Sequence, residues 1–310
     1  MISTPGEQVR SQIRHAVGPM LRSLLNFPIE QRRSQLEAIM SQVQLPSGIE
    51  IEETRIGGVP CEWVRPAGGA QSANAGVFLY LHAGWCTMGS PRTDRSLTAA
   101  LALMSGRSVL SVEYRLAPEY PFPAPLDDTL AVYRALISTG TAPKSILFAG
   151  SSVGGGLSVA AFVALRDAGD PLPAGAVLLS SVTDWAASGA SHVSKVESDM
   201  IDSPAVVTEM RACYLGERDP RNPLASPIYA DLRGLPPLLI QVGGDEILLD
   251  DSTVLAERAQ AAGVPVTLYI GEGMWHNWHM IAASTPFPEG QVALDQIRDF
   301  AAQFSANAVS

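Results

Sequence analysis

A serine between two glycines stands where an expected strand gives way to an expected helix. Residues 150–154 read Gly-Ser-Ser-Val-Gly, with Ser152 at the centre of a G-x-S-x-G pattern. Glycine on either side leaves room for a sharp turn that lifts the Ser152 hydroxyl to the carboxyl end of the strand, beside the positive end of the helix dipole. Without this context the pattern is only a glycine- and serine-rich turn, but with it the sequence predicts a serine nucleophile.

A serine hydroxyl needs a neighbouring base before it can attack an ester. In strand–turn–helix nucleophiles of this kind the partners follow in the order serine, acid, histidine. Two histidines, His276 and His279, follow the last expected strand. We favour His276 as the base and interpret His279 as a structural polar group, whereas His15 and His192 are expected on the surface.

The base in turn needs an acid that orients it. Asp245 follows the expected strand 237–242 through Gly243-Gly244, which places it at the carboxyl edge of the sheet. Glu246 is adjacent, is expected to point away, and is the weaker candidate. Asp250 and Asp251 begin an expected helix, where carboxylates commonly cap the N-terminus. The predicted triad is therefore Ser152, Asp245 and His276.

The negative charge that develops on the substrate oxygen needs backbone N–H donors. One is expected from Val153, the residue after the nucleophile. The others are expected from Gly84 and Trp85, in the loop that follows the apolar run 76–81. In the same loop, His82 and Ala83 are expected to support the backbone rather than to react. No cofactor and no metal are needed for this chemistry.

The elements that must position these residues alternate along the chain. Two β-like runs, 49–56 and 59–65, flank Gly57-Gly58 and predict a hairpin. Apolar runs that predict buried strands then alternate with helical patterns, which predicts an α/β fold with a mostly parallel sheet covered on both faces. The predicted strands are 76–81, 108–112, 145–149, 174–179, 237–242 and 264–270, and the predicted helices are 93–104, 125–137, 153–168, 250–262 and 291–304.

Two regions stand outside this alternation. Residues 1–48 carry two amphipathic helical patterns, and Gly18-Pro19 is expected to kink or split the first. Residues 184–222, between two expected core strands, are polar with scattered helical signals and are interpreted as an insertion. The domain prediction is therefore N-terminal helices over 1–48 and a catalytic domain over 49–310 that contains this insertion.

Composition excludes several classes of protein. The chain has 310 residues, of which 46% are hydrophobic and 17% charged, so it can bury a sizeable core. Its formal charge of −10, without a cluster of lysine or arginine, makes binding to nucleic acid or to an anionic membrane an unfavourable prospect. No run approaches a membrane span, and the polar N-terminus lacks the apolar core of a signal peptide. Three scattered cysteines suit a reducing compartment, so a cytoplasmic location is expected.

Several segments together resemble a known family. They are LHAGWCTMGS at Leu81–Ser90, EYRLAPEYPFPAPLDD at Glu113–Asp128, the GSSVGG turn, and the segments Val242–Asp251 and Gly271–His276. In these the chain resembles the bacterial hormone-sensitive-lipase-like esterases, also called family IV of the α/β-hydrolase fold. The resemblance implies a serine carboxylesterase acting on short- to medium-chain esters, with a cap built from residues 1–48 and 184–222. It also implies a possible homodimer.

Related readings of the same site remain open. Lactone hydrolases, acetyl hydrolases and acyltransferases look similar at this level, and a non-catalytic ligand receptor on the same scaffold is a further alternative. The sequence departs from the family pattern at Trp85, where the family loop has glycine, at Ser151, where it has an acidic residue, and at Val153, where it has alanine. The larger Trp85 and Val153 are expected to crowd the acyl site, unless the Trp85 indole turns into the cap.

Overall fold

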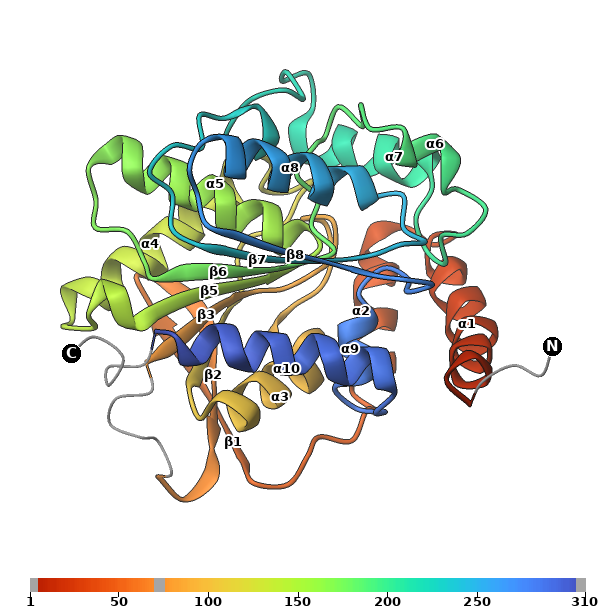
Figure 1. Cartoon of the computed structure of the whole chain (residues 1–310), viewed down its shortest axis with the longest axis horizontal. Coiled ribbons are helices and arrows are strands. Elements are labelled where there is room, and N and C mark those ends of the chain that lie inside the picture. Colours follow the sequence, from red (N-terminus) through yellow and green to blue (C-terminus); the bar gives the residue numbers. More distant parts are fainter. Residues whose placement is uncertain (1–4, 70–75, 305–310) are drawn as a thin grey trace.

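One sheet of eight strands forms the centre of the molecule (Figure 1). The computed structural model describes residues 5–69 and 76–304. The sheet order is β1-β2-β4-β3-β5-β6-β7-β8; β1, β2 and β4 pair antiparallel, and every other neighbouring pair is parallel. The strands are β1 (Ile49–Ile56), β2 (Val59–Pro66), β3 (Val77–Leu81), β4 (Ser108–Val112), β5 (Ile146–Ser151), β6 (Gly175–Leu179), β7 (Leu238–Gly243) and β8 (Val266–Gly271).

Helices cover both faces of the sheet (Figure 1). On one face lie α4 (Ala124–Ser138), α5 (Val153–Ala168) and α8 (Leu249–Ala261), and on the other lie α3 (Arg95–Ser105) and α10 (Pro288–Ala302). Strands β4, β5, β6 and β7 are buried at every position, which explains why their sequences are apolar or small throughout rather than alternating. This confirms the predicted α/β architecture, with each strand within two residues of its expected bounds.

The first helix is longer and less interrupted than expected. Helix α1 (Pro5–Leu24) runs continuously through Pro19 and is followed by α2 (Ile29–Met40). The split expected at Gly18-Pro19 is therefore wrong. A proline removes a single intrahelical hydrogen bond, and side chains from both halves of α1 hold the helix against one segment: Arg14 donates to the carbonyl of Ser198 and Arg22 to that of Met200.

Short helices lie in the connections near the carboxyl ends of the strands. Residues 184–222 contain α6 (Ser191–Ser194) and α7 (Pro204–Leu215), and α9 (Trp278–Ala282) follows β8. Single 3₁₀ turns are Ala67–Gly69, Pro91–Asp94, Pro143–Ser145 and Pro227–Tyr229. Across residues 5–69 and 76–304, none of the helices has both the length and the apolar character that crossing a membrane requires.

Candidate active site

Ser152 occupies a strained turn between β5 and α5. Its backbone angles, φ 55° and ψ −121°, are rare for a residue with a side chain and cost about 1–3 kcal/mol. The turn is held because the Ser152 N–H donates to Leu179 O at 2.7 Å and its carbonyl accepts from Val182 N at 3.1 Å. A Cβ on Gly154 would lie 2.0 Å from Leu81 O, so only glycine lets α5 begin this close to β3. The sequence pattern thus has the physical cause expected of it.

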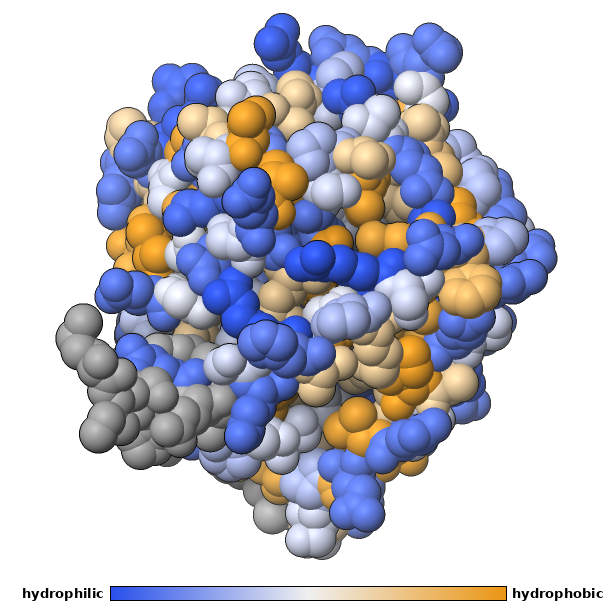
Figure 2. All heavy atoms as spheres, turned by 90° about the vertical axis from the view of Figure 1, so that its right-hand side faces the viewer, coloured by the Kyte–Doolittle hydropathy of each residue, from blue (hydrophilic) through white to orange (hydrophobic). Residues whose placement is uncertain are grey.

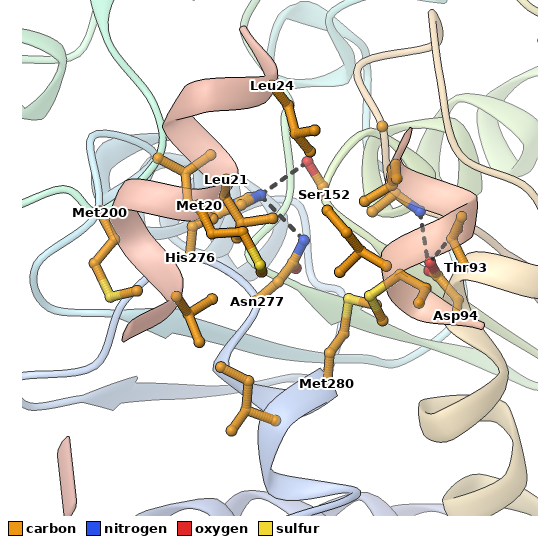
Figure 3. Close-up of a pocket in the computed structure, with 18 of the residues that line it drawn as sticks. Met20, Leu21, Leu24, Thr93, Asp94, Ser152, Met200, His276, Asn277 and Met280 are labelled. Atoms are coloured by element: carbon orange, nitrogen blue, oxygen red, sulfur yellow. Dashed lines mark hydrogen bonds between the residues drawn. The ribbon is translucent and has the colours of Figure 1, made fainter. Parts of the chain in front are cut away.

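His276 meets the nucleophile from the loop between β8 and α9. Its Nε2 lies 3.1 Å from Ser152 Oγ (Figure 3). Both side chains are almost fully buried, His276 with 5% of its surface exposed and Ser152 with 1%. The hydroxyl can therefore donate to a neutral imidazole nitrogen in a site with little competing water. The structure brings these two predicted residues together.

The acid that contacts His276 is Glu246. Its Oε2 lies 2.9 Å from His276 Nδ1, and its Oε1 accepts from Gly243 N at 2.5 Å and from Ser180 Oγ at 2.6 Å. The Asp245 carboxylate instead accepts from Arg14 at 2.8 Å and is partly exposed. The expectations that Asp245 orients the base and that Glu246 points away are therefore both wrong. The turn after β7 folds back so that the second acid, rather than the first, lies over the strand end.

A second pair of polar residues surrounds the histidine. Asn277 Nδ2 lies 3.1 Å from His276 Nε2 (Figure 3), and Asn277 Oδ1 accepts from Ser151 Oγ at 2.7 Å. Asn277 also donates its backbone N–H to Ser180 Oγ at 3.1 Å. The Ser151 departure from the family pattern thus has a structural partner. Sequence reasoning missed Asn277, although a polar residue directly after the expected base was a visible signal.

The other histidines have structural partners or solvent around them. His279 is fully buried, with Nε2 3.1 Å from Gln241 Oε1, and burial together with the nearby His276 lowers its pKa to about 3. It therefore stays neutral, as a structural group would. His15 is exposed, as expected. His192 is buried instead, because its Nε2 lies 2.8 Å from Asp251 Oδ1 and joins residues 184–222 to α8.

A third carboxylate faces the same histidine. Asp202, in the segment between α6 and α7, places Oδ2 3.9 Å from His276 Nδ1 and accepts a hydrogen bond from Trp85 Nε1 on Oδ1 at 3.2 Å. Burial raises the pKa of Asp202 to about 7, against the lowering effect of the charge on His276. Burial by itself lowers the pKa of His276, but the charge of Asp202 and the hydrogen bond to Glu246 outweigh it, and the net direction is upward. Sequence reasoning gave no role to Asp202.

The loop after β3 is held in place by contacts with Tyr114 and Asp94. The His82 ring stacks on Tyr114 with centroids 4.0 Å apart, Tyr114 donates to the His82 carbonyl, and Ala83 N donates to Asp94 Oδ2 at 3.1 Å. These contacts give His82 and Ala83 the supporting place that was expected. Gly84 has φ 123°, and a Cβ there would lie 2.1 Å from Met88 O, so the tight loop requires glycine at this position.

Three backbone donors remain near the nucleophile. Within residues 5–69 and 76–304, the N–H groups of Gly84, Trp85 and Val153 form no hydrogen bond. The Trp85 indole turns toward residues 184–222, where its ring meets Trp185 edge-on with centroids 5.8 Å apart. The indole thus takes the alternative direction, toward residues 184–222, but it still lines the cavity beside Ser152, so its effect on acyl length stays a prediction.

A cavity of about 280 Å³ opens onto Ser152 and His276. Its walls are mostly apolar and come from α1, α2, α9 and the segment before α7; Figure 3 shows side chains of α1 and α9 projecting into it. The wall includes Leu21, Leu24, Ile39, Met40, Met200 and Met280. Trp85 and Met88 also line the cavity, whereas Val153 does not. Among the described residues, no group of three or more histidine, cysteine, aspartate or glutamate side chains is arranged to hold a metal ion.

Comparison with known proteins places this geometry in a family. A model of the alpha/beta hydrolase fold matches residues 78–280. An acetyl-hydrolase of Streptomyces hygroscopicus is 42% identical over 87% of this chain and 88% of its own, and an esterase of Acinetobacter venetianus is 33% identical over 90% of each. A crystal structure of an esterase from the bacterial hormone-sensitive lipase family superposes with a TM-score of 0.88, at 41% identity, over 97% of this chain and 98% of its own.

Proposed function

The chain belongs to the bacterial hormone-sensitive-lipase-like carboxylesterases of the α/β-hydrolase family, and we propose from this premise that it hydrolyses short- to medium-chain esters through an acyl-enzyme on Ser152. The observation that carries the mechanism is the continuous contact from Ser152 Oγ through His276 to Glu246, with distances of 3.1 Å and 2.9 Å. This arrangement performs the roles of nucleophile, base and orienting acid.

Acylation begins when His276 Nε2 takes the proton of Ser152 and Oγ attacks the ester carbonyl. Glu246 accepts a hydrogen bond from the Nδ1–H of His276, which fixes the tautomer whose Nε2 lone pair faces the serine. The tetrahedral intermediate collapses when the alkoxide leaves and takes the proton from His276. Water then enters, gives a proton to His276 and attacks the acyl carbonyl, after which Ser152 regains its proton and the carboxylic acid departs.

The oxyanion of both intermediates is assigned to the N–H groups of Gly84, Trp85 and Val153. Their lack of partners in the described chain supports this role, because hydrogen bonds gained only in the transition state lower the barrier. The supports of the loop at His82 and Ala83 hold two of the three donors in place. No step requires a cofactor or a metal.

Helices α1 and α2 and residues 184–222 are proposed to act together as a cap over the site. Arg14 and Arg22 hold α1 on the segment 198–200, and both helices wall the cavity. Figure 2 looks onto the face that carries α1, where apolar residues gather among charged ones. An acyl chain entering the cavity would replace water along an apolar wall, which favours chains longer than acetyl.

The location and assembly of the protein follow as further parts of the proposal. All three cysteines are free thiols, which suits a cytoplasmic location. A homodimer is proposed on the family resemblance alone, and light scattering after gel filtration tests it. No contact with nucleic acid or membrane is proposed.

The nucleophile is tested with an activated ester and a fluorophosphonate. The wild type should release p-nitrophenol from p-nitrophenyl butyrate and should carry the phosphonate on Ser152, identified by peptide mass spectrometry. Ser152→Ala should lose both, with a fall in rate of about 10⁴- to 10⁶-fold, while its melting temperature stays at or above that of the wild type. A folded Ser152→Ala enzyme with near-wild-type turnover would refute the mechanism.

A further inference from the structure

Asp202 is a buried carboxylate whose position is fixed from three sides. Asp199 Oδ1 accepts hydrogen bonds from Ile201 N and Asp202 N, both at 2.9 Å, and Asp199 Oδ2 accepts from Ile247 N at 2.8 Å. Arg22 of α1 holds the carbonyls of the same segment, at 2.9 Å from Asp199 O. The segment therefore links α1 to the turn that carries Glu246, and it presents Asp202 to the active site with little freedom.

The Asp202 carboxylate lies between the oxyanion loop and the base. Oδ1 accepts from Trp85 Nε1 at 3.2 Å, whereas Oδ2 is buried and has no hydrogen-bond partner in the described chain. Oδ2 lies 3.9 Å from His276 Nδ1, which is too far for a hydrogen bond but close enough for a strong charge interaction. The titratable groups that influence it are His276 from the loop after β8, Glu246 from the turn after β7, and Asp199 on its own segment.

A buried carboxylate with an unpaired oxygen is unfavourable unless a positive charge faces it. In the reactive form of the enzyme His276 is neutral, and that charge appears when His276 accepts the proton of Ser152. The arrangement therefore suits the transition state better than the reactive ground state, which is the condition under which a charge accelerates a reaction.

Building on the proposed function, we propose that Asp202 is a positioning residue that stabilises the protonated form of His276 during catalysis and, through the Trp85 indole, holds the oxyanion loop. Glu246 orients the imidazole by a hydrogen bond, whereas Asp202 acts on it through charge. No proton passes to Asp202, and no bond to it forms or breaks. The segment 198–202 thereby couples the placement of α1 to both halves of the catalytic machinery.

Asp202→Asn separates the charge from the hydrogen bond. The asparagine Oδ1 can still accept from Trp85 Nε1, but the negative charge near His276 Nδ1 is gone. The pKa of His276 then falls, and the acid limb of the pH profile of kcat/KM moves to lower pH. At a separation near 4 Å the expected shift is about 0.7 unit or more. The plateau value of kcat/KM falls as well, because the transition state loses its facing charge.

Asp245→Asn is the matched control. It removes the same charge from a carboxylate that faces Arg14 rather than His276, so the acid limb should stay within about 0.2 unit of the wild type. Both profiles are measured with p-nitrophenyl butyrate, and folding is checked by thermal melting. An acid limb that does not move in folded Asp202→Asn overturns the proposal, as does an equal shift in both variants.

A second variant and a second reaction protect the test against misfolding. Asp202→Ala removes the charge and the acceptor for Trp85 together, so it should show the same acid-limb shift with a lower plateau than Asp202→Asn. The pH dependence of Ser152 labelling by a fluorophosphonate reports the same ionisation without deacylation, and it must shift in parallel. If folded Ser152→Ala keeps wild-type turnover, the proposed function itself fails. If Ser152→Ala is inactive but the acid limb of Asp202→Asn stays where it is in the wild type, only the role of Asp202 fails.

Discussion

Glu246 Oε2 lies 2.9 Å from His276 Nδ1, and the other oxygen of the same carboxylate is held by Gly243 N and Ser180 Oγ. A carboxylate fixed at both oxygens cannot turn away, so the imidazole that it contacts is also fixed. The proton of His276 is thereby kept on Nδ1, and Nε2 faces Ser152 as an acceptor. Adjacent in sequence, Asp245 faces Arg14 instead.

Two adjacent acids therefore make a matched pair of substitutions. Glu246→Gln replaces the acceptor at Nδ1 by an amide that can donate, which favours the wrong tautomer, and kcat should fall on the order of 10⁴-fold. Asp245→Asn should retain turnover within about threefold, because it loses only a partly exposed ion pair with Arg14. The rates are compared with p-nitrophenyl butyrate at the wild-type pH optimum. A larger loss of kcat in Asp245→Asn than in Glu246→Gln would identify Asp245 as the triad acid.

The two neighbouring histidines should separate catalysis from stability. His276→Ala should lower kcat by roughly 10⁶-fold because Ser152 loses its base. His279→Gln should keep most of the activity and destabilise the fold by roughly 1–3 kcal/mol, since it disturbs a buried hydrogen bond to Gln241. Kinetics and urea unfolding of both variants distinguish the two roles. A His276→Ala variant with unchanged kcat would mean that another residue is the base.

The acid limb of the wild-type pH profile of kcat/KM should lie at an unusually high pH. Only neutral His276 accepts the Ser152 proton, so kcat/KM is low below the pKa of His276 and rises as the pH passes through it. The Asp202 charge and the Glu246 hydrogen bond raise that pKa against the opposing effect of burial. The half-maximal point should therefore lie above the ordinary histidine value of about 6.5. A midpoint below pH 6 in a stable enzyme would contradict this electrostatic balance.

The preferred acyl-chain length of the substrate should be set by the wall that α1 contributes to the cavity. With the Trp85 indole held against Trp185, each added CH₂ can contact this apolar wall and gain about 0.8 kcal/mol, or about fourfold in kcat/KM, until the cavity is filled. A p-nitrophenyl ester series should therefore rise from acetate to butyrate or hexanoate and fall by dodecanoate.

Variants of Leu24 provide the internal control for that series. Leu24 lines the cavity and is 5% exposed. Leu24→Trp should shorten the preferred acyl chain while acetate hydrolysis changes little, and Leu24→Ala should lengthen it. Identical chain-length profiles for both variants and the wild type would mean that the acyl group binds on another side of Ser152.

The sequence was most informative where a single physical constraint acts. Continuous apolar runs predict strands buried on both faces, and the glycines around Ser152 predict a tight turn, so the sheet and the nucleophile were accessible without coordinates. The triad acid could not be chosen from the sequence, because Gly243-Gly244 leave open the directions of the next two side chains, Asp245 and Glu246. Asp202 and the direction of the Trp85 indole depend on contacts between residues more than 70 positions apart, for which local pattern carries no signal.

The composition of the cavity wall has a consequence for synthesis of the chain on the ribosome. Helices α1 and α2 are made first, yet Met200 and Met280, which complete the wall with them, follow about 160 and 240 residues after Met40. At a synthesis rate of roughly 5–20 residues per second, about 10–50 s pass between the synthesis of α2 and that of Met280, the last of these partners. A nascent chain lacking residues 276–282 has neither the base nor a finished pocket, so the apolar faces of α1 and α2 stay uncovered until the end of synthesis, before any ester can be bound.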